Sequence, residues 1–188
     1  MQDLKDYFSY SAAEEIMPDI TFSKSGDSLC RFALILDSCE TISKQEISEI
    51  EGRTQLSPLF LDISRDSKHT EIRSYARSLG APVIHPDSKE ELFCALNGCC
   101  FSISEDIKGA VFSFLCDTPS YVNAGDARCR KFLGESARWD ISSEIIIPYT
   151  KNRTANIRRP LVYKSDFSLA KNKFRTEISA EFKRVFID

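Results

Sequence analysis

The segment Cys99-Cys-Phe-Ser-Ile-Ser-Glu-Asp-Ile-Lys-Gly-Ala-Val-Phe-Ser-Phe-Leu-Cys-Asp-Thr-Pro-Ser-Tyr-Val122 decides the fold of this chain. Its first six residues, 99–104, form a short apolar run that is typical of a buried strand. Residues 106–116 then have the length and the apolar character of a helix, and residues 119–122 form a second short strand. Two strands joined by a helix pack as parallel neighbours in one sheet. The segment therefore predicts a parallel sheet with covering helices.

The same alternation of strands and helices continues on both sides of this segment. Toward the N-terminus the sequence predicts strands at 31–38, 57–64 and 82–85 and helices at 43–53, 66–79 and 88–96. Toward the C-terminus it predicts a helix at 126–133, a short strand or packed loop at 145–148, and a long helix at 161–187. This pattern is typical of an α/β fold with one doubly wound, largely parallel, Rossmann-like sheet. We expect residues 1–188 to form a single domain, with a core at about 30–134 and a C-terminal helical segment at about 161–187.

Local signals mark where several of these helices begin and end. Ser43 is followed three residues later by Glu46, which is the pattern of a capping box. Ser88 and Glu91 repeat this pattern at the start of the helix at 88–96. Gly80 follows the helix at 66–79, in the position where glycine commonly ends a helix.

Charge is distributed unevenly along the chain. Residues 1–127 carry 11 basic and 21 acidic side chains, a net charge of −10. Residues 128–188 carry 14 basic and 7 acidic side chains, a net charge of +7. The basic part indicates either an anion-binding face or a solvated, charged terminal helix. It lacks the interleaved aromatic residues of a nucleic-acid-binding module, so we do not expect a nucleic-acid partner.

The seven cysteines do not form a metal-binding pattern. They lack paired C-x-x-C spacing, and the chain has two histidines, so we expect no metal and no other cofactor. No apolar run follows Met1 in the way a secretory signal requires, and no stretch approaches the ~20 apolar residues of a membrane span. We therefore expect a cytoplasmic protein with free thiols. The cysteines are at positions 30, 39, 94, 99, 100, 116 and 129.

Three loops that join a predicted strand to a predicted helix are candidate binding loops, because ligands of such sheets bind beyond the carboxyl ends of the strands. They are residues 64–68, 102–109 and 123–128. Their hydroxyls and the cations Arg65, Lys68, Lys108 and Arg128 suit a phosphate or a carboxylate. The alternative interpretation is that their polar residues only cap helices. The chain contains no G-x-G-x-x-G, P-loop or G-x-S-x-G motif, so these classes of site lose their main support.

Residues 90–135 resemble the polysaccharide pyruvyl transferases. The stretch Glu90-Glu-Leu-Phe-Cys-Ala-Leu-Asn-Gly-Cys-Cys-Phe-Ser-Ile-Ser104 is similar to the helix and strand before that family's Arg-Leu-His motif. The spacing that follows is also kept, through Gly109, an apolar helix at 110–116 and Pro119. Asp126 and Arg128 then stand where the family has an aromatic-Asp-x-Lys segment, followed by the pair Phe132-Leu133. Weaker similarity extends back through residues 31–80.

The resemblance implies a fold and a set of site residues. The matching half of the family has a GT-B-like glycosyltransferase fold, which acts together with a second domain, so the acceptor half is expected on another chain or in a part of the protein that this sequence does not include. The resemblance assigns anion binding to Lys108 and Arg128, a hydroxyl donor to Ser104, and capping or orientation to Asp126. Arg65 joins this donor-binding set as a cation of the loop at 64–68.

The key motif of the family is altered in this chain. Its Arg, Leu and His positions fall on Asp106, Ile107 and Lys108. In the family the Arg and the His are implicated in holding phosphoenolpyruvate. An aspartate in place of the arginine puts a negative charge beside a trianionic ligand, which is repulsive. The catalytic residues are therefore left unassigned.

Three functions remain open after the sequence analysis. The first is a donor-binding domain, similar to a pyruvyl or glycosyl transferase, that acts in cell-surface polysaccharide modification on phosphoenolpyruvate or a sugar nucleotide. The second is a non-catalytic descendant of that family that binds a protein partner, a second copy of itself or a sugar nucleotide. The third is an unrelated flavodoxin-like binding module.

Overall fold

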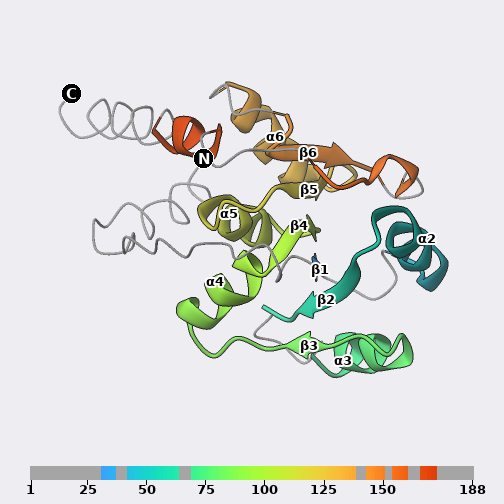
Figure 1. The fold of residues 1–188 in the computed structure, drawn as a ribbon. Coiled ribbons are helices and arrows are strands. Elements are labelled where there is room, and N and C mark those ends of the chain that lie inside the picture. The colour runs from blue at the N-terminus through green and yellow to red at the C-terminus, as the bar shows by residue number, and fades with distance from the viewer. Residues whose placement is uncertain are drawn as a thin grey trace.

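Six parallel strands form a single sheet at the centre of the chain (Figure 1). The computed structural model describes residues 31–36, 42–63, 69–138, 143–150, 154–160 and 166–172. The strands are β1 (Arg31–Ile35), β2 (Ser57–Leu61), β3 (Val83–Ile84), β4 (Cys99–Ser104), β5 (Ser120–Asn123) and β6 (Ile146–Tyr149).

The order of the strands across the sheet is β3-β2-β1-β4-β5-β6, and every neighbouring pair is parallel. The chain therefore winds outward from β1 to β3, returns to the middle at β4, and winds outward again to β6. This is the order of a Rossmann-like α/β fold. The predicted fold class is confirmed, and the predicted segment at 145–148 forms a strand, β6, instead of a packed loop.

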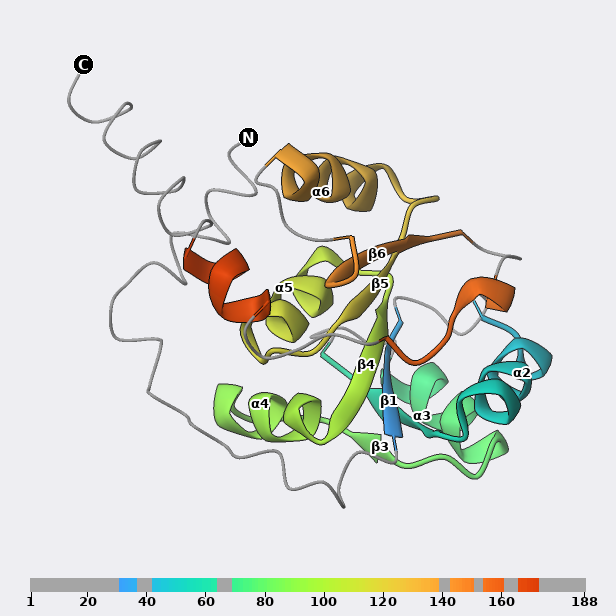
Figure 2. The same cartoon turned by 45° about the horizontal axis from the view of Figure 1, so that its top comes forward.

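Helices cover both faces of the sheet (Figure 2). They are α2 (Lys44–Thr54), α3 (His69–Ser78), α4 (Lys89–Asn97), α5 (Ile107–Leu115) and α6 (Ala127–Arg138), with a 3-10 turn, η2 (Thr154–Asn156). Apolar residues of α2 and α3 pack in one core cluster with Phe32, Phe60 and Phe101. Residues of α4, α5 and α6 pack in two other clusters against the opposite face, where Ala33 and Val122 lie.

The capping signals in the sequence are largely confirmed. The hydroxyl of Ser43 accepts a hydrogen bond from the backbone N–H of Glu46, and the Glu46 carboxylate accepts one from the N–H of Ser43. Ser88 likewise accepts from the N–H of Glu91 at the start of α4. Gly80 has a φ of +67°, the left-handed conformation that a glycine adopts at low cost.

One predicted helix ends later than expected, and another is described only in part. α6 continues to Arg138 instead of ending at Leu133, because Phe132 and Ser136 are buried on the same side and Gly134 stands in open space. Of the long helix predicted at 161–187, residues 166–172 are described and are helical. Phe167 packs in the cluster of α5 and α6, and the remainder of the predicted helix lies outside the described residues. None of the helices in the described part of the chain has both the length and the hydropathy that a membrane crossing requires.

Candidate functional site

The candidate site lies at the carboxyl edge of the sheet, where β1 and β4 are neighbours. The connections from these two strands run in opposite directions, toward β2 and toward β5. In open α/β sheets ligands bind outside the strand ends at such a switch point. The backbone N–H of Glu105 donates to the carbonyl of Ile35 over 3.0 Å and holds the two strands together up to this edge.

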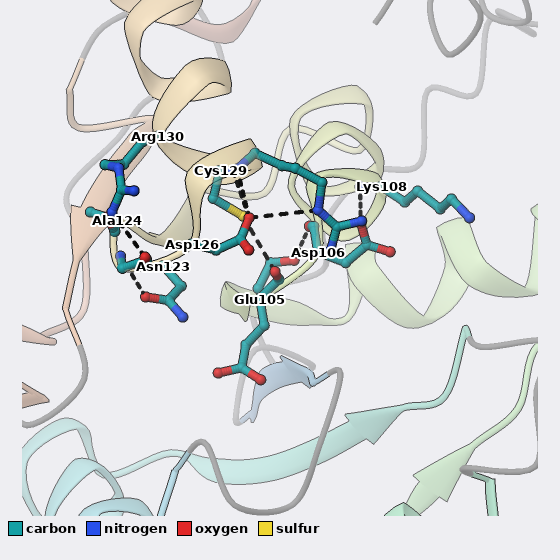
Figure 3. Close-up of polar contacts among 11 residues, drawn as sticks. Glu105, Asp106, Lys108, Asn123, Ala124, Asp126, Cys129 and Arg130 are labelled. Atoms are coloured by element: carbon teal, nitrogen blue, oxygen red, sulfur yellow. Dashed lines mark hydrogen bonds and ion pairs between the residues drawn. The ribbon is translucent and has the colours of Figure 1, made fainter. Parts of the chain in front are cut away.

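The loop from β4 to α5 contains two of the predicted site residues, Ser104 and Lys108. Ser104 is buried, and its hydroxyl donates to the carbonyl of Asp106 over 2.6 Å. Asp106 caps α5, because its carboxylate accepts from the backbone N–H of Lys108 over 3.2 Å. The side chain of Lys108 is exposed and extends away from Glu105 and Asp126 (Figure 3). The helix N-terminus that would meet a donor anion is therefore occupied by a carboxylate of the chain itself.

The loop from β5 to α6 contains the other two, Asp126 and Arg128. The carboxylate oxygen Oδ1 of Asp126 accepts from the backbone N–H groups of Arg128 and Cys129, each over 2.9 Å. The hydrogen bond from Cys129, followed by the one from Arg128 and the charge of Arg128, lowers the pKa of Asp126 despite partial desolvation. Arg128 is exposed, and its Nε lies 3.8 Å from Oδ1 of Asp126. Asp126 therefore acts as the cap of α6, and Arg128 places a cation beside it.

Arg130 and Asn123 shape the same loop. The Nη1 of Arg130 donates to the carbonyls of Ala124 and Gly125, over 3.2 and 2.9 Å. The side-chain oxygen of Asn123 accepts from the N–H of Gly125 over 2.9 Å. These bonds hold the loop in one conformation at the end of β5.

The structure brings four of the five predicted residues to two adjacent loops. β4 and β5 are neighbours, so the loop of Ser104 and Lys108 lies beside the loop of Asp126 and Arg128. Ser104 and Asp126 have structural hydrogen bonds there, whereas Lys108 and Arg128 lie on the surface. Arg65 lies outside the described residues, so its place in the donor-binding set stays a prediction.

Three buried residues at the carboxyl edge were not identified as site residues by the sequence analysis: Glu105 after β4, Tyr149 at the end of β6, and Cys129 in the first turn of α6. Glu105 is 4% exposed and Tyr149 is 5% exposed. The thiol of Cys129 donates to the backbone carbonyl of Glu105 over 3.3 Å, and burial raises the pKa of this thiol to about 12, which keeps it protonated. The phenol oxygen of Tyr149 is buried and has no hydrogen-bond partner in the part of the chain that the structure describes.

A signal for Glu105 was present in the sequence. Alternate residues of a strand project from the same face of a sheet. Glu105 therefore continues the row of Phe101 and Ile103, which lie in the core cluster of that face. A carboxylate that continues such an apolar row is buried at the strand end. No comparable signal points to Tyr149, because the sequence does not decide whether the preceding segment, 145–148, is a strand or a packed loop.

His85 and Asp62 form a second polar pair at the same edge, at the ends of β3 and β2. Nδ1 of His85 lies 2.8 Å from the backbone carbonyl of Asp62 and 3.8 Å from its carboxylate oxygen Oδ2. A carbonyl only accepts hydrogen bonds, so Nδ1 carries the proton and donates it. This partner of His85 could not be recognised from the sequence, since the two residues are 23 positions apart.

The described residues contain no group of three or more histidine, cysteine or acidic side chains that could hold a metal ion. The polar groups at the carboxyl edge of β4, β5 and β6 are a buried carboxylate and a buried phenol, capped helix N-termini and surface cations. Comparisons with family models, with curated proteins and with solved structures find no match to this chain.

Proposed function

We propose that this chain is the donor-binding domain of a transferase similar to the polysaccharide pyruvyl transferases. The sheet order supports this proposal most directly, because the β4–α5 loop lies at the switch point of a Rossmann-like sheet and the β5–α6 loop lies beside it. These are the loops in which the chain resembles that family. Lys108 and Arg128 are the surface cations that would attract the charged part of the donor.

The transfer itself requires groups that a donor-binding domain does not contribute alone. In this proposal, Lys108 and Arg128 attract the donor anion, and the two capped helices α5 and α6 fix the loops around it. The acceptor would approach from a second domain, on this or another chain. The proposal assigns binding and orientation to the described residues and no catalytic group.

Asp106 gives specific support to the second candidate function, a non-catalytic binding domain. Its carboxylate already accepts from the N–H of Lys108 at the start of α5, where a donor phosphate or carboxylate would have to bind. A negative charge at this place repels a donor anion. The single exposed large apolar residue in the described part of the chain, Leu169, gives that candidate no broad apolar docking surface.

Asp106→Asn distinguishes the two functions. Asparagine also caps helices, so this variant removes the charge while keeping the cap. If the chain binds a donor anion, the affinity for phosphoenolpyruvate or UDP-glucose rises roughly three- to tenfold. Lys108→Ala lowers the same affinity. Melting temperatures of the full chain at millimolar ligand, followed by calorimetric titration, measure both effects.

Glu90→Gln is the matched control, because Glu90 is exposed in the first turn of α4 and its substitution removes the same charge. It should leave ligand affinity unchanged. If neither ligand shifts the melting temperature of the wild type or of Asp106→Asn, the donor-binding proposal is wrong and the non-catalytic function is favoured.

A further inference from the structure

Three polar side chains lie level with one another across β4, β5 and β6. Ser104 pairs with Val122, so the next residue, Glu105, is level with Asn123. Asn123 in turn pairs with Tyr149. Level residues of parallel strands project from the same face of the sheet, and neighbouring strands lie about 4.8 Å apart. Glu105, Asn123 and Tyr149, called the polar row below, therefore lie on one face of the sheet, at the ends of β5 and β6 and directly after β4.

The polar row continues the apolar core outward to the carboxyl edge. One level below it, on the same face, Ile103 and Tyr121 belong to the core cluster that α2 covers. Glu105 and Tyr149 remain as buried as that core, with exposures of 4% and 5%. The side chains of Glu105 and Asn123 turn away from Lys108 (Figure 3), so the polar row is separate from the surface cations of the β4–α5 loop.

The phenol of Tyr149 is buried, and none of the described residues forms a hydrogen bond with it. Buried polar groups in folded proteins are nearly always paired, so this phenol stands out as a donor that the described part of the fold does not use. Burial and, next, the charge of Glu105 raise the pKa of Tyr149, so the phenol keeps its proton and remains a donor.

We propose that the polar row binds a hydroxyl group of the donor, on a sugar or ribose ring. This inference rests on the proposed donor-binding function and names the class of donor, a sugar nucleotide. A hydroxyl accepts from the phenol of Tyr149 and donates to the carboxylate of Glu105 at the same time. A phosphate or carboxylate only accepts and is repelled by Glu105, whereas an ammonium group only donates and leaves the phenol hydrogen without an acceptor.

The test compares Tyr149→Phe and Glu105→Gln with the wild type in calorimetric titrations with UDP-glucose, GDP-mannose and phosphoenolpyruvate. Each variant removes one hydrogen-bonding function while keeping the shape of the side chain. Both should weaken the affinity for the sugar nucleotides roughly 5- to 20-fold. Neither should weaken the affinity for phosphoenolpyruvate, and Glu105→Gln should raise it, since it removes a negative charge.

Tyr121→Phe is the matched control. The phenol of Tyr121 lies one level below the polar row and is paired, since it donates to the carbonyl of Arg158 over 2.8 Å and accepts from the N–H of Arg158 over 3.1 Å. Tyr121→Phe should therefore lower the melting temperature and leave ligand affinity unchanged. Tyr149→Phe should raise the melting temperature, because it removes a buried hydroxyl that has no partner among the described residues. It should also weaken the affinity for sugar nucleotides.

The outcomes separate this inference from the proposed function. If a sugar nucleotide binds and neither Tyr149→Phe nor Glu105→Gln changes its affinity, the polar row holds only water and this inference is wrong, while the proposed function stands. If only phosphoenolpyruvate binds, the donor class is wrong. If no donor binds, the proposed function itself fails.

Discussion

The two halves of the carboxyl edge use polar residues differently. In the half formed by β1 to β3, β2 and β3 are followed by Asp62 and His85, which hydrogen-bond to each other. In the half formed by β4 to β6, β4 is followed by Glu105 and β6 ends in Tyr149, whose buried phenol has no hydrogen-bond partner among the described residues. The first pair completes the sheet. In the second half the phenol of Tyr149 keeps a donor that the described part of the fold does not use, and for this reason we infer a ligand site in the second half.

The imidazole of His85 supplies a hydrogen bond of the β2–β3 ladder that Pro86 cannot donate. In the parallel ladder the N–H of Asp62 donates to the carbonyl of Ile84 over 3.0 Å. The next bond of such a ladder would run from the N–H of residue 86 to the carbonyl of Asp62. Proline has no N–H, and the imidazole of His85 supplies the donor in its place. A histidine at a strand end near a candidate site is thus explained by backbone pairing.

Gly109 connects the two halves, and its substitution should have the largest effect. A Cβ on Gly109 would collide with the hydroxyl of Ser104 on β4 and would lie 2.7 Å from Cγ2 of Ile35 on β1. Gly109→Ala should therefore destabilise the chain by about 1–3 kcal/mol, because α5 must move away from both strands. Urea unfolding of the full chain measures the loss.

Gly134→Ala is the control for helix propensity. Gly134 lies within α6 and has nothing within 4 Å of an added Cβ. Alanine there should stabilise the chain by about 0.5–1 kcal/mol. Equal effects of the two substitutions would contradict the close packing of α5 on the junction of β1 and β4.

The pairing of His85 with Asp62 predicts the next largest effect. His85→Ala removes the donor to the Asp62 carbonyl and should cost about 1–2 kcal/mol of unfolding free energy. Pro86→Ala restores an N–H at the position that the ladder would use. In the Pro86→Ala background, His85→Ala should therefore cost about 1 kcal/mol less than in the wild type.

A double-mutant cycle by urea unfolding measures this coupling. Additive effects of the two substitutions would mean that the N–H of residue 86 does not replace the imidazole. His85 would then stabilise the chain through another contact. The claim that polar residues in the half formed by β1 to β3 complete the backbone pairing of the sheet would be wrong.

Much of the fold could be predicted from the sequence because its signals are local. The apolar run at 99–104 and the capping serines Ser43 and Ser88 depend on neighbouring residues, and they fixed the position of strands and helix starts. The end of α6 was predicted too early because Gly134 reads locally as a stop. Burial of Ser136 on the face of Phe132, a tertiary effect, carries the helix through it.

The candidate site was less predictable because its groups meet only through the sheet. Glu105 and Tyr149 come from strands two positions apart in the sheet and 44 residues apart in the chain, so no spacing in the sequence joins them. His85 was assigned no partner for the same reason. Lys108 and Arg128 could be placed on strand–helix loops from the sequence. The positions of the capping carboxylates beside them, Asp106 and Asp126, depend on the conformation of the folded loops.

Helix caps provide the smallest and most specific contrast between the two halves. Asp126, a charged cap, begins α6, whereas Ser88, a neutral cap, begins α4 after β3. Replacing either residue by alanine should cost about 1 kcal/mol of unfolding free energy at about pH 7. Hydrogen bonds from Cys129 and Arg128 hold the pKa of Asp126 below its ordinary value of 3.8, so the folded chain favours the ionised carboxylate.

The stabilisation by the Asp126 charge is therefore present above pH 3.8 and is lost as the pH falls through the lowered pKa. The cost of Asp126→Ala should shrink between about pH 7 and about pH 3, while the cost of Ser88→Ala stays constant, because a hydroxyl does not titrate in this range. Urea unfolding of both variants along this pH series measures the two slopes. A penalty for Asp126→Ala that does not change with pH would show that the cap acts through hydrogen-bond geometry alone, and the charge at the start of α6 would then not distinguish this half of the edge from the other.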